Sequence, residues 1–249
     1  MSDSSTPAPN YRIAVLDDPD TIRKQQARMR PIADRPAGML VVHEIYASIQ
    51  GESTYAGLPC TFIRLTGCPL RCRWCDTPHS FKEGSPMSIE AILAEVEKLS
   101  PKLVEVTGGE PLSHPECDEL LERLANTGRK VLLETSGAIP TDTVDPRVTV
   151  ILDMKCPSSG EVGSNHYPNL ARLKTGDEVK VVIGTRDDFD WSVELIRKHD
   201  LTRYSILFSP IYGELTHEQL VNWIMETGLP IRLQVALHKV IWGPEVRGV

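Results

Sequence analysis

Three cysteines stand close together in the run Cys68-Pro-Leu-Arg-Cys72-Arg-Trp-Cys75. Thiolates are preferred ligands of iron–sulfur clusters and zinc, so this short stretch can hold one metal centre without ligands from distant segments. With His79 as a fourth ligand it would form a Cys₃His zinc site. Three thiolates alone would instead leave one iron of a four-iron cluster free to bind another molecule. Unligated buried cysteines explain the run less well, because this arginine-flanked stretch has no apolar periodicity.

Glycine, threonine, serine and charged residues also gather in several segments that follow β-rich runs. These segments read TGCPLRCRWCDT, TGGEP, ETSG, DMK and SPIYG. In proteins built on parallel strands, active sites gather at the carboxyl ends of the strands, where these segments would meet. Any one of them also fits an ordinary turn. Their coincidence predicts a functional rim on one side of a sheet.

Short β-rich runs alternate with helical patterns from Leu40 onward. We expect strands near 41–47, 61–66, 103–106, 130–134, 149–152, 179–183, 204–208 and 231–235. We expect helices at 88–99, 114–127, 189–199 and 216–227. Ser88 and Thr216 stand at the expected N-caps of two of these helices, and Gly128 and Gly228 stand just after the expected ends of two. The alternation predicts an α/β fold with a mainly parallel sheet, either open or closed into a partial barrel.

The composition is that of an ordinary globular chain, with 249 residues, 41% of them hydrophobic and 24% charged. This length fits one large domain with one core. A net charge of −7 and the lack of a basic stripe argue against nucleic-acid binding. No apolar run is long enough to cross a bilayer and no signal peptide is recognisable, so we expect a cytoplasmic protein. In that reducing compartment, six cysteines favour metal binding over disulfides.

The N-terminal part, residues 1–38, is predicted to be an appendage that is partly disordered. Residues 1–10 are rich in serine and proline, and a short helix is expected from Ile22 to Met29. Residues 39–249 form the predicted domain.

The spacing C-x₃-C-x₂-C resembles the defining loop of the radical S-adenosylmethionine superfamily, and Thr107-Gly108-Gly109-Glu110-Pro111 resembles its GGEP-like segment. The resemblance implies a [4Fe–4S] cluster whose open iron binds the amino and carboxylate groups of S-adenosylmethionine. One-electron reduction would then yield a 5′-deoxyadenosyl radical. In that superfamily such cofactors carry the chemistry, while the protein places and shields them. A partial or modified (β/α) barrel is the implied fold.

Three further stretches resemble the 7-carboxy-7-deazaguanine synthase family of the queuosine pathway. They are Ile49-Gln50-Gly51-Glu52, the run from Phe62 to Thr77, and Leu237-His238-Lys239 followed by Trp242-Gly243-Pro244. The resemblance covers about 40–249. It implies a carbon–nitrogen lyase that converts 6-carboxy-5,6,7,8-tetrahydropterin to 7-carboxy-7-deazaguanine and releases ammonia. It also implies Mg²⁺ as a cofactor, a homodimer, and an electron donor such as a flavodoxin or ferredoxin.

The family's functional positions transfer to residues of this chain. Cys68, Cys72 and Cys75 would hold the cluster, and Thr77 would supply an oxygen ligand to Mg²⁺. Arg64 would bind the substrate carboxylate with two parallel donors. The other implied substrate contacts are Ile49, Gln50, Gly51, Thr107, Glu134, His238 and Pro244. The implied S-adenosylmethionine contacts are Gly109, Glu110, Asp153, Met154, Lys155, Ser209, Pro210, Ile211 and Tyr212.

Local sequence leaves alternatives open for some of these residues. Thr77 would also suit a turn cap, and Glu134 and His238 would suit structural hydrogen bonds. The tail that follows Pro244 would displace this proline from the substrate if it closed the pocket itself. Two other functions compete with the synthase: an activase that makes a glycyl radical on another protein, and a non-catalytic Cys₃His zinc module.

Overall fold

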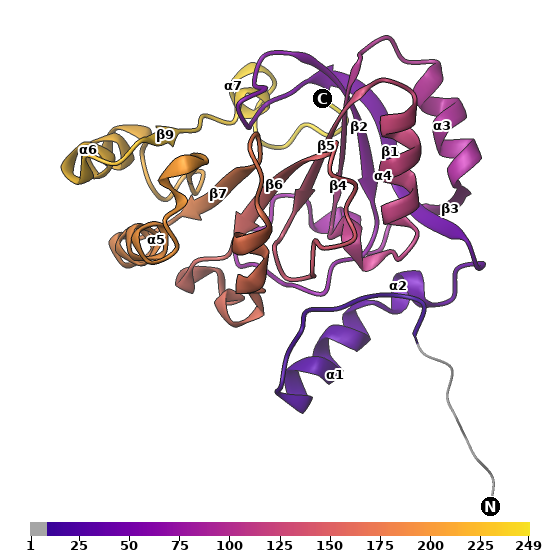
Figure 1. Cartoon of the computed structure of the whole chain (residues 1–249), viewed down its shortest axis with the longest axis horizontal. Coiled ribbons are helices and arrows are strands. Elements are labelled where there is room, and N and C mark those ends of the chain that lie inside the picture. The colour runs from indigo at the N-terminus through magenta and orange to yellow at the C-terminus, as the bar shows by residue number, and fades with distance from the viewer. Residues whose placement is uncertain (1–8) are drawn as a thin grey trace, which may run out of the picture.

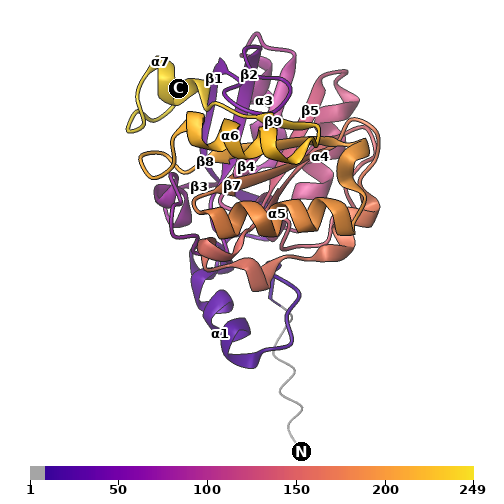
Figure 2. The same ribbon diagram turned by 90° about the vertical axis from the view of Figure 1, so that its left-hand side faces the viewer.

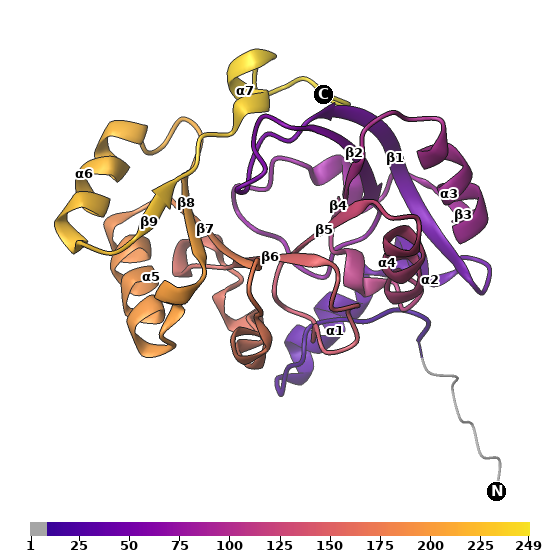
Figure 3. The same ribbon diagram turned by 45° about the horizontal axis from the view of Figure 1, so that its top comes forward.

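In the computed structural model, which describes residues 9–249, nine strands form one sheet in the order β3-β1-β2-β4-β5-β6-β7-β8-β9. The strands are β1 (Met39–Ile49), β2 (Pro59–Leu65), β3 (Ser85–Ser88), β4 (Leu103–Gly108), β5 (Lys130–Thr135), β6 (Thr149–Met154), β7 (Glu178–Ile183), β8 (Ser205–Pro210) and β9 (Ile231–Leu233). β1 pairs antiparallel with β2 and β3, and all pairs from β2 to β9 are parallel. The strongly curved sheet ends at β3 and β9, so it is a partial barrel, as predicted (Figure 3).

Helices cover the convex side of this sheet (Figures 1 and 2). The α-helices are α1 (Pro19–Arg28), α2 (Arg30–Ala33), α3 (Ile89–Glu97), α4 (Cys117–Asn126), α5 (Arg186–Lys198), α6 (His217–Thr227) and α7 (Leu237–Ile241). Short 3₁₀ helices span Pro78–Phe81, Pro111–Ser113, Pro157–Ser159, Val162–Ser164, Tyr167–Arg172 and Leu201–Arg203. The outer core has two parts: α3 and α4 pack over β1 to β5, and α5 and α6 pack over β6 to β9. None of the helices in the described region is long and apolar enough to cross a membrane.

Strand alternation decides which side chains face the hollow of the barrel. On β2, Ile63 and Leu65 are fully buried in the outer core, whereas Phe62 and Arg64 line the inner cavity. Successive side chains of a strand point to opposite faces, so one strand supplies both the core and the site. Arg64 therefore faces the cavity.

All eight predicted strands and all four predicted domain helices are present. Ser88 accepts a hydrogen bond from the backbone N–H of Ala91 at 3.2 Å. Thr216 and Gln219 form the expected capping box, and Gly228 ends α6 with a φ of +63°. The prediction omitted β3, an edge strand of sequence SPMS that pairs with β1.

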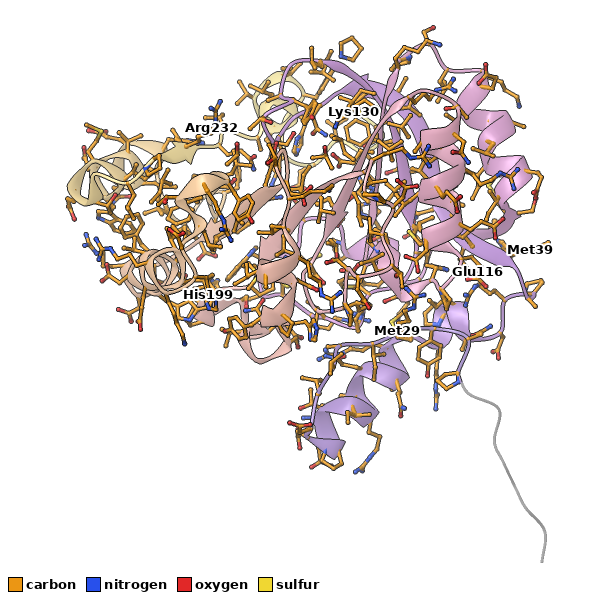
Figure 4. The ribbon with its side chains drawn as sticks, viewed as in Figure 1. Met29, Met39, Glu116, Lys130, His199 and Arg232 are labelled. Carbon is orange, nitrogen blue, oxygen red and sulfur yellow. The ribbon has the colours of Figure 1, made fainter. Side chains whose placement is uncertain are left out.

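The segment before β1 packs against the domain along much of its length. α1 starts at Pro19, earlier than predicted, because the carboxylate of Asp18 accepts the N–H groups of Asp20 and Thr21. Met29 and Ile32 are fully buried at the junction, and Met29 is labelled in Figure 4. Most of the stretch expected to be disordered, residues 1–8, lies outside the described residues.

Candidate active site

A cavity of about 910 Å³ fills the hollow of the partial barrel. Its wall comes from the inner faces and carboxyl ends of the parallel strands, together with the loops that follow them. All five rim segments identified in the sequence contribute lining residues, so the functional rim forms as predicted. The cavity places most of the expected site residues around one space.

The three cysteines lie on one wall of this cavity, in the cluster loop, which we define as residues 66–77. Cys68 is buried, and Cys72 and Cys75 are partly exposed. Burial raises the pKa of the Cys68 and Cys72 thiols. A thiol in this setting becomes a thiolate most readily when a metal cation binds it.

The position of His79 argues against the Cys₃His zinc alternative. His43, Glu44 and His79 form a separate group whose ligand atoms all lie within 4.8 Å of one another. His79, the fourth ligand of the zinc alternative, packs instead against His43 with ring centroids 4.8 Å apart.

Hydrogen bonds fix the backbone of the cluster loop. The Arg71 side chain donates from Nη1 to the carbonyls of Cys68 at 2.7 Å and Leu70 at 2.6 Å. The Arg71 backbone N–H donates to Glu161 Oε1 at 2.7 Å. The guanidinium also stacks on Phe81, 4.0 Å from the ring centroid. The loop is thus ordered by contacts of the protein itself.

The GGEP-like segment lies directly against the cluster loop. The backbone N–H of Glu110 donates to the Gly67 carbonyl at 2.8 Å. A Cβ on Gly109 would stand 2.2 Å from Gly67 O and 2.9 Å from the Cys68 Cβ, so glycine alone fits there. Gly109 itself lines the cavity beside the cysteines.

Two expected cofactor contacts are not at the cavity. The Glu110 carboxylate is fully buried and accepts hydrogen bonds from Leu112 N, Thr135 Oγ1 and both Ser136 N and Oγ, at 2.5 to 3.0 Å. Its side chain therefore joins its own loop to the loop after β5 instead of facing a ligand. Met154 points into the outer core, because it alternates with the inward-facing Asp153 and Lys155.

The other expected S-adenosylmethionine positions do line the cavity; they are Gly109, Asp153, Lys155, Ser209, Pro210, Ile211 and Tyr212. Lys155 Nζ pairs with Asp153 Oδ2 at 2.9 Å. Although burial opposes a charged ammonium, Asp153 and the neighbouring Cys72 raise the pKa of Lys155. Lys155 is therefore a charged ammonium group, paired with Asp153, near the cysteines.

Thr77 lies at the edge of the cluster loop, with its hydroxyl 3.9 Å from Cys75 Sγ. It lines the cavity and begins the 3₁₀ helix Pro78–Phe81. Its hydroxyl makes no capping hydrogen bond there; the Thr77 carbonyl instead accepts from Ser80 N at 3.0 Å and Ser80 Oγ at 2.8 Å. The turn-capping alternative thus loses support, and the Thr77 hydroxyl is not used by the helix that it precedes.

Arg64, near the end of β2, also lines the cavity. Its Nε donates to Glu44 Oε1 at 2.8 Å and its Nη2 to the Tyr46 hydroxyl at 3.2 Å. Among the described residues, Nη1 has no hydrogen-bond partner. The guanidinium is thus held in place by protein groups and keeps donors for a ligand carboxylate.

Lys180 occupies the floor of the cavity between three carboxylates. Its Nζ contacts Glu52, lies 2.6 Å from Glu134 Oε1 and lies 3.9 Å from Asp153 Oδ2. Burial alone would raise the pKa of Glu134, but the charge of Lys180 outweighs this effect and lowers the pKa. Glu134 Oε2 also accepts from Thr107 Oγ1 at 3.2 Å. Glu134 is therefore an oriented carboxylate that lines the cavity.

Glu105 lies beside this group and behaves differently. Burial and the negative charge of Glu134 raise the pKa of Glu105, which favours its protonated form. Its partner is the side-chain amide of Gln50, whose own carbonyl oxygen accepts from the backbone N–H of Glu52 at 3.1 Å. The floor therefore combines an ionised and a protonable carboxyl group, an amide and an ammonium group.

The C-terminal part of the chain completes the cavity. A Cβ on Gly51 would lie 2.4 Å from His238 Nδ1, so this glycine permits close approach of α7. Burial lowers the pKa of His238. Pro244 lines the cavity together with Glu245 and Val249, so the tail borders the pocket without displacing the proline from its wall. Figure 3 shows the C-terminus close to β1 and β2.

Sequence reasoning missed Lys180, Glu105, Glu52 and Gln234 as cavity residues. Lys180 and Glu105 could have been found from the sequence, because each is the single charged residue in an apolar strand segment, VKVVI and LVEV respectively. A charge inside a buried strand is costly unless it faces a polar site. Ile49, Gln50, Gly51, Thr107, Glu134 and His238 line the cavity as expected.

Comparison with known proteins gives consistent matches. The family model described as the radical SAM superfamily matches residues 62–225. The 7-carboxy-7-deazaguanine synthase of Koribacter versatilis is 46% identical over 224 residues, which cover 84% of this chain and 99% of that protein. The enzyme of the same name from Chlorobaculum tepidum is 42% identical over 214 residues, covering 84% and 97%. This chain thus carries additional sequence that these relatives lack.

The solved structure of QueE from Escherichia coli has a similar fold. It superposes with a TM-score of 0.66 at 24% sequence identity and covers 87% of this chain and 98% of that chain. This match supports the partial-barrel architecture.

Proposed function

Because the chain belongs to the radical S-adenosylmethionine superfamily and to its 7-carboxy-7-deazaguanine synthase family, we propose that it converts 6-carboxy-5,6,7,8-tetrahydropterin to 7-carboxy-7-deazaguanine and releases ammonia. It is a radical S-adenosylmethionine enzyme of queuosine biosynthesis. Its cofactors are a [4Fe–4S] cluster, S-adenosylmethionine and Mg²⁺. The observation that carries the proposal is one cavity lined by three cysteines and by an arginine that protein groups hold in place.

Cys68, Cys72 and Cys75 would hold the cluster, which when bound supplies the electron that cleaves S-adenosylmethionine. The wall formed by Gly109, Asp153, Lys155 and Ser209–Tyr212 would bind the cofactor beside it. Because Gly109 packs tightly on the cluster loop, its backbone is available at short range to a ligand there. The three thiolates leave one iron for the cofactor to occupy.

The substrate would lie across the cavity floor. Arg64 would bind its carboxylate, and a guanidinium held by Glu44 and Tyr46 loses little freedom on binding. The amino-pyrimidinone edge of a pterin presents adjacent donors and acceptors. Gln50 and Glu134 offer complementary groups at fixed positions, and Lys180 keeps Glu134 ionised. His238 and Pro244 would close the site from the C-terminal side.

Thr77 would supply one oxygen ligand to Mg²⁺, with water and substrate oxygens completing its shell. The same proposal includes two further points. The protein would be a homodimer in the cytoplasm, and a flavodoxin or ferredoxin would supply its electrons.

Substrate discrimination tests this proposal. The anaerobically reconstituted enzyme is given 6-carboxytetrahydropterin or the same tetrahydropterin without the carboxylate. Mass spectrometry looks for the ring-contracted product of each, 7-carboxy-7-deazaguanine from the first and 7-deazaguanine from the second. Product should arise from the carboxylated substrate alone. If the carboxylated pterin is left unchanged by protein with a full cluster, the substrate assignment is wrong.

A further inference from the structure

The N-terminal segment, residues 11–35, packs on the outer side of the cluster loop (Figures 1 and 2). Ala14 and Leu16 belong to the same apolar cluster as Cys68 and Leu70. At Gly67, the residue before Cys68, an added Cβ would lie 3.0 Å from Ile32 Cγ2 and 3.2 Å from Met29 Cε. The segment therefore touches the loop at its first ligand.

One arginine of this segment bonds to the loop backbone between two of the cysteines. Arg28 Nη1 donates to the Pro69 carbonyl at 2.7 Å and to Glu161 Oε1 at 2.9 Å. The same Glu161 oxygen accepts the backbone N–H of Arg71 at 2.7 Å. Arg28 thus bonds to the loop directly at position 69 and through Glu161 at position 71.

A buried glutamine sets the position of this arginine. Gln25 is fully buried, accepts the Ala14 N–H at 3.0 Å and donates to Ser164 Oγ at 3.2 Å. Ser164 Oγ in turn donates to Glu161 Oε2 at 3.2 Å. A buried amide with both ends bonded holds its helix in one register, so α1 keeps Arg28 over the loop.

We propose that the N-terminal segment is a clamp on the cluster loop and that Arg28 is a positioning residue for the iron–sulfur cluster. This proposal rests on the assignment of the cluster to Cys68, Cys72 and Cys75. Iron leaves a cluster when its loop opens locally, and the opening frequency depends on the free energy of the contacts that hold the loop. Arg28 keeps the loop closed without touching the cavity.

The test compares three variants with the wild type as anaerobically reconstituted full-length protein. Arg28→Ala removes both bonds, Arg28→Lys retains the charge, and Arg12→Ala is the matched control. Arg12 also anchors the segment, through Asp118 Oδ2 at 2.9 Å, but it contacts α4 rather than the loop. The readout is the rate at which the cluster's charge-transfer absorbance disappears after an iron chelator is added. The unfolding midpoint of each iron-free protein is measured in parallel.

Arg28→Ala should lose its cluster on the order of tenfold faster than the wild type, because a charge-assisted bond to a partly buried group is lost. Arg28→Lys should fall between the two, and Arg12→Ala should stay within about twofold of the wild type. A wild-type rate in Arg28→Ala, or equal acceleration in Arg12→Ala, overturns the clamp. Wild-type protein that takes up zinc instead of iron would overturn the cluster assignment itself.

Discussion

Replacement of Lys180 by methionine tests the electrostatic design of the cavity floor. The side chain of Lys180 is 9% exposed and its ammonium faces Glu52, Glu134 and Asp153, whose side chains are 22%, 25% and 12% exposed. Removal of one partner from such a group leaves uncompensated charge, which costs about 3–5 kcal/mol. For a chain of this size each kcal/mol lowers the melting temperature by about 2–4 °C. We therefore expect Lys180→Met to melt roughly 10 °C lower at pH 7.

The pH dependence of this loss distinguishes charge from packing. The folded-state pKa of Glu134 is below its ordinary value of 4.5, so its stabilising contribution is present above that pH and is lost as the pH falls through the folded pKa. The pKa of Lys180 is raised above 10.5, so its own contribution is present throughout the neutral range. Without Lys180, burial raises the pKa of Glu134 above 4.5. The difference between variant and wild type should therefore be largest at neutral pH, begin to shrink above pH 4.5, and go on shrinking as the pH falls through the lowered wild-type pKa.

Urea and thermal unfolding of both proteins measure these differences. Lys98→Met is the matched control, because Lys98 is 65% exposed and pairs with Glu95 on the surface; it should change stability by less than about 0.5 kcal/mol. The double variant Lys180→Met/Glu134→Gln should regain part of the loss. A Lys180→Met protein as stable as Lys98→Met would refute the electrostatic account.

Three further changes test single residues. His114 is buried, its Nε2–H donates to the Thr66 carbonyl at 2.9 Å, and burial lowers its pKa from 6.5 to about 4. Its neutral form favours folding, so stability is lost as the pH falls from 6.5 towards 4; between pH 7 and 5, urea titrations should show about 2 kcal/mol less loss in His114→Gln. Thr77→Ala should require about tenfold more Mg²⁺ for half-maximal activity, and an unchanged magnesium titration would remove this residue from the metal site. Arg64→Lys should raise the KM for the carboxylated pterin about 10- to 100-fold, whereas equal KM values would exclude a carboxylate contact.

The sheet was predictable because its parallel strands are buried on both sides and read as runs of branched apolar residues. The caps at Ser88 and Thr216 likewise fixed the starts of two helices. β3 was not predictable, since Ser-Pro-Met-Ser has little β propensity and its pairing with β1 depends on backbone contacts from a distant segment. β3 is therefore a strand because of its pairing with β1 and not because of its own sequence.

In the site, the cysteine spacing and the rim segments were visible in the sequence. The direction of each side chain also follows from its place in a strand. Strand alternation separates Met154 from Asp153 and Lys155, and it would have excluded the methionine. The capture of the Glu110 carboxylate by Ser136 joins loops 26 positions apart, which no local pattern signals. The same holds for the placement of Arg28 on the cluster loop.

The central claim is that the three-cysteine loop starts radical chemistry on a carboxylated pterin bound in the same cavity. The most direct measurement is one anaerobic assay of wild type and Cys72→Ser with reductant, S-adenosylmethionine, Mg²⁺ and 6-carboxytetrahydropterin, together with the iron content of each protein. We predict about four irons per chain and 7-carboxy-7-deazaguanine from the wild type, and no product from Cys72→Ser. Product at the wild-type rate from the variant, or none from wild type with a full cluster, would contradict the account.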